Sequence, residues 1–429
     1  MSKTNFPEYL KSDVMYQLFL RSCTAEGTLN AAAQLLPHIK SIGADIVYLC
    51  PPFAHDLDDN PDHWSPRQHA SKTGNPSNPY RMKDYYNIDP EYGTNADLRA
   101  FIDAAHALGL KVILDLVYLH CGPKAVFLDE HPDYVRRDAD GNLLTNNYHF
   151  LLLNFDNPAL CEYMWQNMEF CIREFDCDGF RCDVGDAVPL FFWEEGRRRI
   201  DAVKPGCMML NEGSKAAMLD KAFDISYDFG LYRKLFDVLD GKAPASALVE
   251  YRKNFEAENL GGDGMSILCF DNHDISNDTY ENRAEKRFGE AACDAMLFLI
   301  YTMRGVPFLY NGQEVCDANR HSIWANRFHG ANMVVDWQNA LTEKGQRRME
   351  YLRGLAKLHR ESPAICGGSM QWLETTAPES VVAYLREAEG QRLLFAVNLT
   401  GAPVTAGIAV GGETKPVSLG GYGTMMAEM

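Results

Sequence analysis

The segment Gly179-Phe-Arg181-Cys-Asp183 is a short apolar run that ends in charged side chains. Three further apolar runs end in the same way: Asp115-Leu-Val-Tyr-Leu-His120, Leu210-Asn-Glu212 and Phe270-Asp-Asn272-His273-Asp274. Burying a charge is costly, so acids, histidines and an arginine at such positions need a reason. In a barrel of parallel strands, the carboxyl ends of the strands form the catalytic face. We therefore treat these four run ends as the candidate site and ask whether the rest of the chain predicts a barrel.

Short β-type runs alternate with longer amphipathic stretches along most of the chain. The β-type runs are Val14 to Phe19, Ile46 to Cys50, Val112 to Tyr118, Gly179 to Cys182, Met208 to Leu210, Phe223 to Tyr227, Ser266 to Phe270 and Val306 to Tyr310. The amphipathic stretches include Ala31 to Ile42, Ala96 to Leu108, Pro158 to Phe175 and Ala291 to Met303. This alternation predicts an α/β fold with a parallel sheet. Eight strand-helix units over about 350 residues favour a (β/α)8 TIM barrel, although the pattern alone leaves an open sheet as an alternative.

The barrel pattern is interrupted after the third strand and stops near Gly367. Turn signals such as Asp140-Gly141 follow the third strand, and β-type runs alternate with glycine-rich turns after Gly367. We therefore predict a catalytic barrel over residues 1–120 and 155–366, a short insertion over residues 121–154, and a small antiparallel β domain over residues 367–429.

Composition restricts the class of protein. A chain of 429 residues with 46% hydrophobic content can bury a large core. Its formal charge of -18 disfavours nucleic acid and anionic membranes as partners. No basic and apolar leader opens the sequence and no apolar run reaches membrane-spanning length, so we expect a cytoplasmic protein. The twelve cysteines lie in apolar contexts without paired short spacings, which indicates reduced, buried thiols.

The four run ends resemble the four conserved regions of the α-amylase family of glycoside hydrolases, glycoside hydrolase family 13, in the family's order and on the expected strands. The segment from Asn78 to Thr94 is similar to the family's second-loop signature, and Gly305 to Glu314 resembles its eighth-strand motif. The resemblance implies a retaining α-glycoside hydrolase that acts on α-glucosidic oligosaccharides through a covalent glycosyl-enzyme intermediate.

Retaining hydrolysis requires one carboxylate that attacks the anomeric carbon and a second, protonated one that donates to the leaving oxygen. The resemblance assigns these roles to Asp183 and Glu212, and implies that Asp274 grips substrate hydroxyls and distorts the ring. Arg181 lies two residues before Asp183, on the same side of the strand, and can keep it ionised. Glu212 needs a raised pKa to hold its proton near neutrality.

Four more residues receive supporting roles from the resemblance. Tyr80 matches the tyrosine that stacks on the sugar, and His120 and His273 match the histidines that hydrogen-bond it. Asp115 matches the acid that supports the site and is expected to hold Arg181. Each of them alone would more often be a strand-end or cap residue. Their joint occurrence in register favours the functional interpretation.

Four residues depart from the family pattern. Leu119 stands where the family usually has an asparagine ligand of a structural calcium, and Leu152 stands where an acid ligand would fall. Leucine offers no oxygen ligand, so we predict that the common calcium site is missing and that the protein needs no metal or cofactor. Asp186-Ala187 replaces the Lys-His of amylases that cut long chains. We therefore expect different leaving-group binding and a small oligosaccharide as the partner, not starch.

Two alternative functions stay open at this point. The same covalent intermediate could pass to phosphate or to another sugar, which would make the protein a transglycosidase, phosphorylase or isomerase of the family. A barrel that binds sugars or partners without catalysis is the second alternative. The sequence does not separate hydrolysis from transfer, and it predicts neither the linkage nor the oligomeric state.

Overall fold

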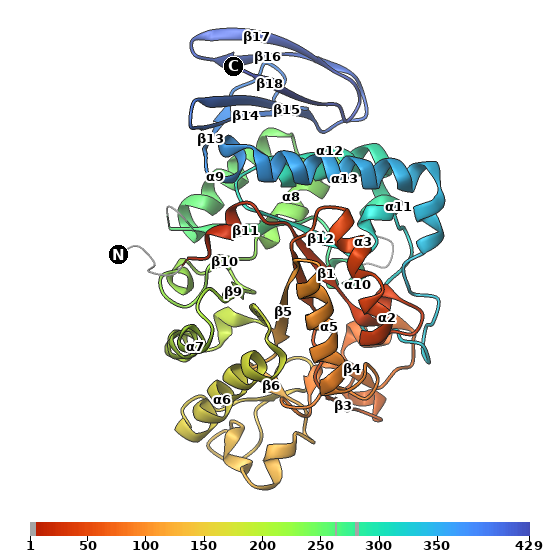
Figure 1. Ribbon diagram of the computed structural model, residues 1–429, viewed down its shortest axis with the longest axis vertical. Helices are drawn as coiled ribbons and strands as arrows, with labels where there is room; N and C mark the ends of the chain where they lie inside the picture. Colours follow the sequence, from red (N-terminus) through yellow and green to blue (C-terminus); the bar gives the residue numbers. More distant parts are fainter. Residues whose placement is uncertain (1–5, 262–263, 279–282) are drawn as a thin grey trace.

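The computed structural model describes residues 6–261, 264–278 and 283–429. Eight parallel strands close into a barrel (Figure 1), with hydrogen-bonded neighbours in the order β1-β12-β11-β10-β9-β8-β5-β2. Their bounds are β1 (Met15–Leu18), β2 (Ile46–Leu49), β5 (Lys111–Leu116), β8 (Gly179–Cys182), β9 (Met208–Asn211), β10 (Ile225–Ser226), β11 (Met265–Leu268) and β12 (Val306–Tyr310). The predicted (β/α)8 barrel is confirmed, and the open sheet is excluded.

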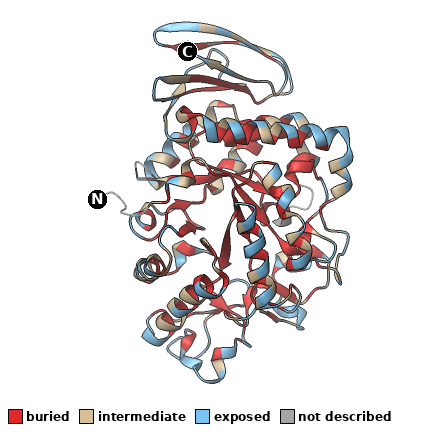
Figure 2. Ribbon diagram, in the orientation of Figure 1, coloured by how far each residue is buried: buried red, intermediate tan, exposed pale blue. Residues whose placement is uncertain are grey.

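Helices surround the barrel and turn their buried faces towards it (Figure 2). The long ones are α5 (Asn95–Ala107), α6 (Pro158–Phe175), α7 (Leu190–Val203), α8 (Phe229–Leu239), α9 (Ser246–Asn259), α12 (Glu290–Thr302) and α13 (Glu343–Glu361). The short ones are α1 (Leu20–Cys23), α2 (Leu29–Ala33), α3 (Leu36–Ser41), α4 (Pro66–Ser71), α10 (Ile275–Asp278), α11 (Ala284–Phe288) and α14 (Pro363–Cys366). The strands are buried on both faces, which explains why they read as continuous apolar runs.

Two elements differ from their predicted form. The single helix expected from Ala31 to Ile42 is two helices, α2 and α3, because Pro37 lies in the first turn of α3 and has no N–H to continue α2. The sixth strand, expected from Phe223 to Tyr227, pairs with its neighbours only at Ile225 and Ser226.

Two hairpins follow barrel strands on the carboxyl side. Strands β3 (His55–Leu57) and β4 (Ser77–Met82) pair after β2, with α4 between them. Strands β6 (His120–Cys121) and β7 (Leu151–Leu152) pair after β5 and enclose the predicted insertion. The exact domain limits stay predictions. Both hairpins extend the barrel on the side where polar run ends were expected to gather.

The C-terminal segment forms two antiparallel sheets (Figure 1). One contains β13 (Ser369–Leu373), β14 (Val381–Ala388), β15 (Gln391–Asn398) and β18 (Thr424–Glu428), and the other contains β16 (Val404–Val410) and β17 (Glu413–Leu419). A small core that includes Leu385 and Ile408 joins the two sheets. The ring of Phe395 in β15 has its centroid 5.9 Å from that of Phe298 in α12. The C-terminal domain therefore packs against the barrel helices. The predicted β domain is confirmed.

The cysteines carry free thiols, and eleven of the twelve are buried. Cys171, Cys177 and Cys182 belong to the hydrophobic core. Among the described helices, none combines the length and the apolar character needed to cross a membrane.

Candidate active site

The three predicted catalytic acids meet at the carboxyl end of the barrel. Asp183 directly follows β8, Glu212 directly follows β9, and Asp274 lies in the turn after β11. All three line one cavity of about 340 Å³, together with Tyr80 and His120. Of the other predicted residues, Arg181, His273 and Asp115 are buried, and each contacts a residue of this lining: Arg181 pairs with Asp183, and both His273 and Asp115 contact the hydroxyl of Tyr80. The structure therefore brings the predicted set into one place.

Arg181 is the electrostatic centre of the site. Its Nη1 atom lies 2.7 Å from Asp115 Oδ1 and 3.0 Å from Asp183 Oδ1, as the sequence led us to expect. Its Nη2 atom lies 2.7 Å from Glu212 Oε1, a contact that strand alternation did not predict. One guanidinium thus holds three carboxylates, and it places Asp183 and Glu212 on two adjacent nitrogens of a planar group.

Burial changes how the two acids hold protons. Burial raises the pKa of Asp183 well above its usual range, and the charge of Glu212 adds to this, whereas Arg181 opposes it. Burial also raises the pKa of Glu212, again against the opposing charge of Arg181. Since the two carboxyls share one guanidinium, they titrate as a pair. Such a pair can keep one proton at a pH where free carboxyls have lost theirs.

Val184 is a site residue that sequence reasoning missed. Its backbone lies in the left-handed region, with φ of 44° and ψ of 42°, which is unfavourable for a β-branched residue. In this conformation its N–H donates to Glu212 Oε2 at 2.7 Å, and its side chain lines the cavity. A valine in a sequence gives no signal for this role. The left-handed backbone of Val184, next to Asp183, therefore aims the N–H that orients Glu212.

Asp186 braces the segment that follows Glu212. Its carboxylate accepts a hydrogen bond from Asn211 Nδ2 at 2.9 Å and from the N–H of Ser214 at 2.9 Å. The Nζ atom of Lys215 donates back to the carbonyl of Asp186 at 2.8 Å. The residue that replaces the family's lysine is therefore already engaged within the protein.

A hydrogen-bond chain fixes His273. Gln17 Nε2 donates to His273 Nδ1 at 2.7 Å, so the proton of the neutral ring is assigned to Nε2. That Nε2 atom lies 2.6 Å from Tyr80 Oη, and the Tyr80 hydroxyl donates onward to Asp115 Oδ2 at 3.0 Å. Burial lowers the pKa of His273, which agrees with a neutral ring. The Tyr80 ring stacks on His273 with centroids 5.5 Å apart, so the two residues form one rigid wall.

His120 also lines the cavity as a neutral ring. Burial lowers its pKa to about 4, and its Nε2 atom donates to the carbonyl of Tyr80 at 3.0 Å. Phe150 of the insertion packs on His120 with ring centroids 4.8 Å apart. Asn146 and Tyr148 of the same insertion reach the cavity as well. None of the three insertion residues was predicted.

Asp274 is paired with Arg67, a different cation from the Arg181 that holds the other acids. Arg67 of α4 donates through Nη2 to Asp274 Oδ1 at 2.9 Å, and His273 Nε2 lies 3.4 Å from Asp274 Oδ2. Burial would raise the pKa of Asp274, but His273 and Arg67 outweigh it and hold the pKa below its usual range. The backbone turn is fixed because Asn272 Oδ1 accepts the N–H groups of Asp274 and Ile275. Arg67 was missed because no motif surrounds it in its long loop.

One group of side chains in the described part of the chain has metal-ligand geometry. The ligand atoms of His55, Asp89 and Glu91 lie within 4.8 Å of one another. Arg21 donates to Glu91 at 2.9 and 2.8 Å and lies 3.1 Å from His55. Its guanidinium already supplies positive charge at this point, so we assign no metal to the group. The expected loss of the calcium site stays a prediction.

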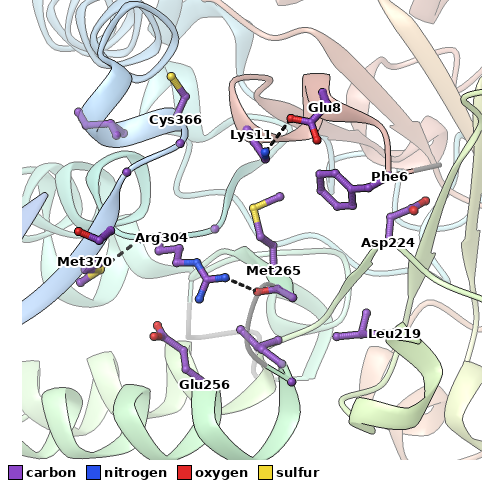
Figure 3. A pocket seen from close by; sticks show the side chains of 18 of the residues that line it. Phe6, Glu8, Lys11, Leu219, Asp224, Glu256, Met265, Arg304, Cys366 and Met370 are labelled. Atoms are coloured by element: carbon purple, nitrogen blue, oxygen red, sulfur yellow. Dashed lines mark hydrogen bonds and ion pairs between the residues drawn. The ribbon is translucent and has the colours of Figure 1, made fainter. Parts of the chain in front are cut away.

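A larger cavity of about 840 Å³ lies at the opposite end of the barrel (Figure 3). Its lining includes Met265 and Gly305, at the amino-terminal ends of β11 and β12. Arg304, labelled in Figure 3, also lines the cavity, and its Nη2 atom donates to the carbonyl of Gly264 at 3.1 Å. None of the three candidate catalytic acids lines this cavity. The smaller cavity is the candidate active site.

Comparison with known proteins identifies the family. The model described as Alpha amylase, catalytic domain matches residues 13–149 and 143–351. The chain belongs to the α-amylase family. The matched region includes every predicted site residue and ends before the C-terminal sheets.

The relatives of this α-amylase family member include curated proteins from archaea and bacteria. The α-amylase MalA of Haloarcula japonica is 25% identical over 97% of this chain and 59% of its own length. The maltogenic α-amylase of Bacillus acidopullulyticus is 23% identical over 87% of this chain and 62% of its own length. The chain thus spans about six tenths of the length of these relatives.

Solved structures show the same fold over whole chains. The maltogenic α-amylase AmyB of Thermotoga neapolitana is 24% identical, with a TM-score of 0.80 over 98% of this chain and 97% of AmyB. The cyclic α-maltosyl-(1→6)-maltose hydrolase of Arthrobacter globiformis is 20% identical, with a TM-score of 0.78 over 99% of this chain and 100% of that one. The family fold is therefore present from the barrel through the terminal sheets.

Proposed function

We propose that the protein is a retaining glycoside hydrolase that cleaves α-glucosidic bonds in oligosaccharides. The observation that carries this proposal is the double contact of Arg181 with Asp183 and Glu212. Inverting enzymes separate their two carboxyls by roughly 6.5–9.5 Å to admit a water, whereas retaining enzymes keep them about 5 Å apart. Two carboxylates on adjacent nitrogens of one guanidinium suit the shorter, retaining arrangement.

The reaction follows from these positions. Asp183 attacks the anomeric carbon while Glu212 donates its proton to the leaving oxygen, so the glycosidic bond breaks as the glycosyl-enzyme bond forms. Glu212 then removes a proton from water, the hydroxide attacks the anomeric carbon, and Asp183 leaves as a carboxylate. Arg181 stabilises the negative charge as it moves between the two acids.

The remaining residues hold the sugar. Asp274, kept ionised, accepts hydrogen bonds from sugar hydroxyls, and the ring of Tyr80 offers its face to the apolar side of a pyranose. His120 and His273 are neutral and can donate or accept hydrogen bonds without adding charge. Asp115 acts through Arg181 and Tyr80 and is a positioning residue.

The proposed setting is cytoplasmic, with a small oligosaccharide as the substrate and without a metal or cofactor. Relatives named as intracellular maltogenic amylases in Bacillus subtilis support this setting. The cyclomaltodextrinase of a Bacillus species, 23% identical over 92% of this chain, supports a short α-glucan substrate.

The test is product analysis by mass spectrometry with maltose and maltotriose, in the presence and absence of phosphate. We expect glucose or maltose as products, the same with and without phosphate, and an α-anomer in the first product measured by NMR. Sugar 1-phosphate would show phosphorolysis, and longer saccharides as the main product would show transfer. Sugar binding without turnover would show that the barrel is not a catalyst.

A further inference from the structure

The large cavity at the amino end of the barrel is lined by both the barrel and the C-terminal domain. Its wall combines the starts of β11 and β12 with Met370 of β13 and Arg386 of β14. In Figure 3, Arg304 and Met370 lie to the left of the cavity and Asp224 lies to the right. A volume of about 840 Å³ is in the range of small-molecule sites. The cavity can therefore hold a metabolite that contacts both domains.

Arg386 is a buried cation that no carboxylate pairs with in the described part of the chain. Its side chain is among the largest that are fully buried. Its Nη1 atom donates to the carbonyl of Thr302 at 3.0 Å, and its Nη2 atom donates to the carbonyls of Ile365 and Gly368. Its Nε atom has no hydrogen-bond partner among the described residues. The carbonyls orient the guanidinium, but its full charge is buried without a counter-ion, which is costly.

Arg304 adds a second guanidinium to the same wall. The N–H of Arg304 donates to the sulfur of Met370 at 3.3 Å, and Met370 is the cross-strand partner of Arg386. Burial lowers the pKa of Arg386 to about 10, and the like charge of Arg304 contributes to this shift. Both groups are charged near neutral pH, so each makes the charge of the other more costly. An anion in the cavity would offset that cost.

Acids on the rest of the wall limit the kind of anion. Asp224 lines the cavity and is paired with Arg197 at 2.8 Å. Glu256 lines it as well and is paired with Arg252 at 2.7 Å. A paired carboxylate still accepts hydrogen bonds from hydroxyl groups, whereas a large polyanion would be repelled. The cavity thus suits a small ligand with one anionic end and several hydroxyls.

We propose that this cavity binds a phosphorylated monosaccharide, with the phosphate towards Arg304 and Arg386 and the hydroxyls towards the acids. The planar fork of arginine matches phosphate oxygens. The linings of this cavity and of the catalytic cavity share no residue in the described part of the chain, so the inference does not rest on the proposed glycosidase function. A ligand that binds only the folded protein should also raise its Tm.

The test is isothermal titration calorimetry at low salt with glucose 6-phosphate, inorganic phosphate and glucuronate. We expect saturable binding of glucose 6-phosphate, and binding at least about tenfold weaker for the other two ligands, because each lacks one of the two matched ends. Absence of saturable binding of glucose 6-phosphate would overturn the site. Equal binding of inorganic phosphate would overturn the sugar, and tighter binding of glucuronate would overturn the phosphate.

Variants of the two arginines test where the phosphate binds. Arg304→Gln should weaken the binding of glucose 6-phosphate by about tenfold or more and remove the rise in Tm. A folded Arg386→Gln protein should do the same, and Arg304→Gln decides the question if Arg386→Gln does not fold. Arg173→Gln is the matched control, because the side chain of Arg173 is 64% exposed on α6 and does not line the cavity. Equal affinities in Arg304→Gln and Arg173→Gln would overturn the proposal.

A last variant separates this cavity from the catalytic one. Tyr80 lines the catalytic cavity and not the large one, so Tyr80→Ala should leave the affinity for glucose 6-phosphate unchanged. Weaker binding in Tyr80→Ala would place the ligand in the catalytic cavity and would overturn the second site. Binding of glucose 6-phosphate needs no turnover, so a protein that binds it without cleaving oligosaccharides would contradict only the proposed function.

Discussion

The two ends of the barrel treat buried charge in opposite ways. At the carboxyl end, Asp115, Asp183 and Glu212 share the single cation Arg181. At the amino end, each of two arginines is shared by two acids. Arg197 is paired with Asp224 at 2.8 Å and with Asp201 at 3.0 Å, and Arg252 is paired with Glu256 at 2.7 Å and with Asp228. The exposed Glu8 is paired with Lys11 at 2.6 Å. The first end concentrates negative charge and the second neutralises it.

This difference in charge pairing indicates that the amino end contributes to stability and the carboxyl end to reactivity. A paired, hydrogen-bonded charge is compatible with burial, whereas a crowded group of carboxylates raises the free energy of the folded state. The raised pKa of Asp183 and the left-handed Val184 both lie at the crowded end. Strain and charge are tolerated there because the rest of the barrel over-determines the structure. Substitutions at the two ends should therefore have opposite effects on stability.

The largest effect is expected for Asp183→Asn, which removes the nucleophile. We expect kcat/KM to fall by at least about a thousandfold. The free energy of unfolding at pH 7 should rise by about 0.5–2 kcal/mol, because a crowded buried charge is gone. A carboxyl whose pKa is raised in the folded state stabilises the fold below its unfolded pKa, and this contribution is lost as the pH rises. The free energy of unfolding that Asp183→Asn gains over the unmodified protein should therefore increase from pH 4 upwards.

Oligosaccharide assays and urea unfolding at several pH values measure both quantities. Asp84→Asn is the matched control, since Asp84 binds the N–H of Tyr86 at 2.8 Å and does not line the cavity. It should keep the activity. A strongly destabilised Asp183→Asn protein would show that Asp183 is a structural partner of Arg181, and the contrast between the two ends would fail.

At the amino end, Asp224→Asn should do the reverse. It breaks a buried pair with Arg197, which still pairs with Asp201, and it weakens the acceptor for the N–H of Met209. We expect a loss of about 3 kcal/mol in urea unfolding, with normal activity per folded molecule. Asp220→Asn, at an exposed position on the same cavity, should change stability by less than about 0.5 kcal/mol. Equal losses in the two variants would contradict the argument.

His359 is a buried histidine that is neutral in the folded protein. His359 of α13 donates through Nδ1 to the carbonyl of Tyr301 at 2.8 Å, and burial lowers its pKa to about 4. Between pH 6.5 and 4 the unfolded chain binds a proton that the folded protein does not, so stability falls as the pH falls. His359→Gln keeps a donor and should remove about 2 kcal/mol of that acid loss, measured by urea unfolding at pH 6.5 and 4.5. His69→Gln, at an exposed position, should keep the original slope, and an unchanged slope in His359→Gln would refute the assignment.

Sequence reasoning predicted the barrel and the ends of its strands because parallel strands need apolar residues on both faces. The limits of β8 and β12 agree with the predicted runs, and so does α6. The helix expected from Ala31 to Ile42 was wrong, since the amphipathic period hid the effect of Pro37. Periodicity describes which face is buried, but it does not detect a missing N–H.

The candidate site was predictable only where it follows strands. Asp183 and Glu212 directly follow strands, and Asp274 lies in the turn after β11, so the sequence motifs and the barrel topology together predicted that they meet. Arg67 reaches the site from a loop, and Asn146 from the insertion. Their positions depend on loop packing that no spacing rule describes. The second contact of Arg181, to Glu212, depends on rotamer and could not be read from alternation along β8.

The smallest predicted effect concerns the backbone strain at the carboxyl end. Val184 has φ of 44°, where glycine is at ease and valine is strained, so Val184→Gly should raise the free energy of unfolding by about 1 kcal/mol. Val188→Gly is the matched control, because Val188 has φ of -86° and is buried, and it should destabilise the protein. Activity of Val184→Gly should fall severalfold through kcat, since a looser N–H orients Glu212 less well. If thermal unfolding shows Val184→Gly to be less stable than the unmodified protein, then the valine contributes packing that outweighs its strain, and the carboxyl end is not the strained end of the barrel.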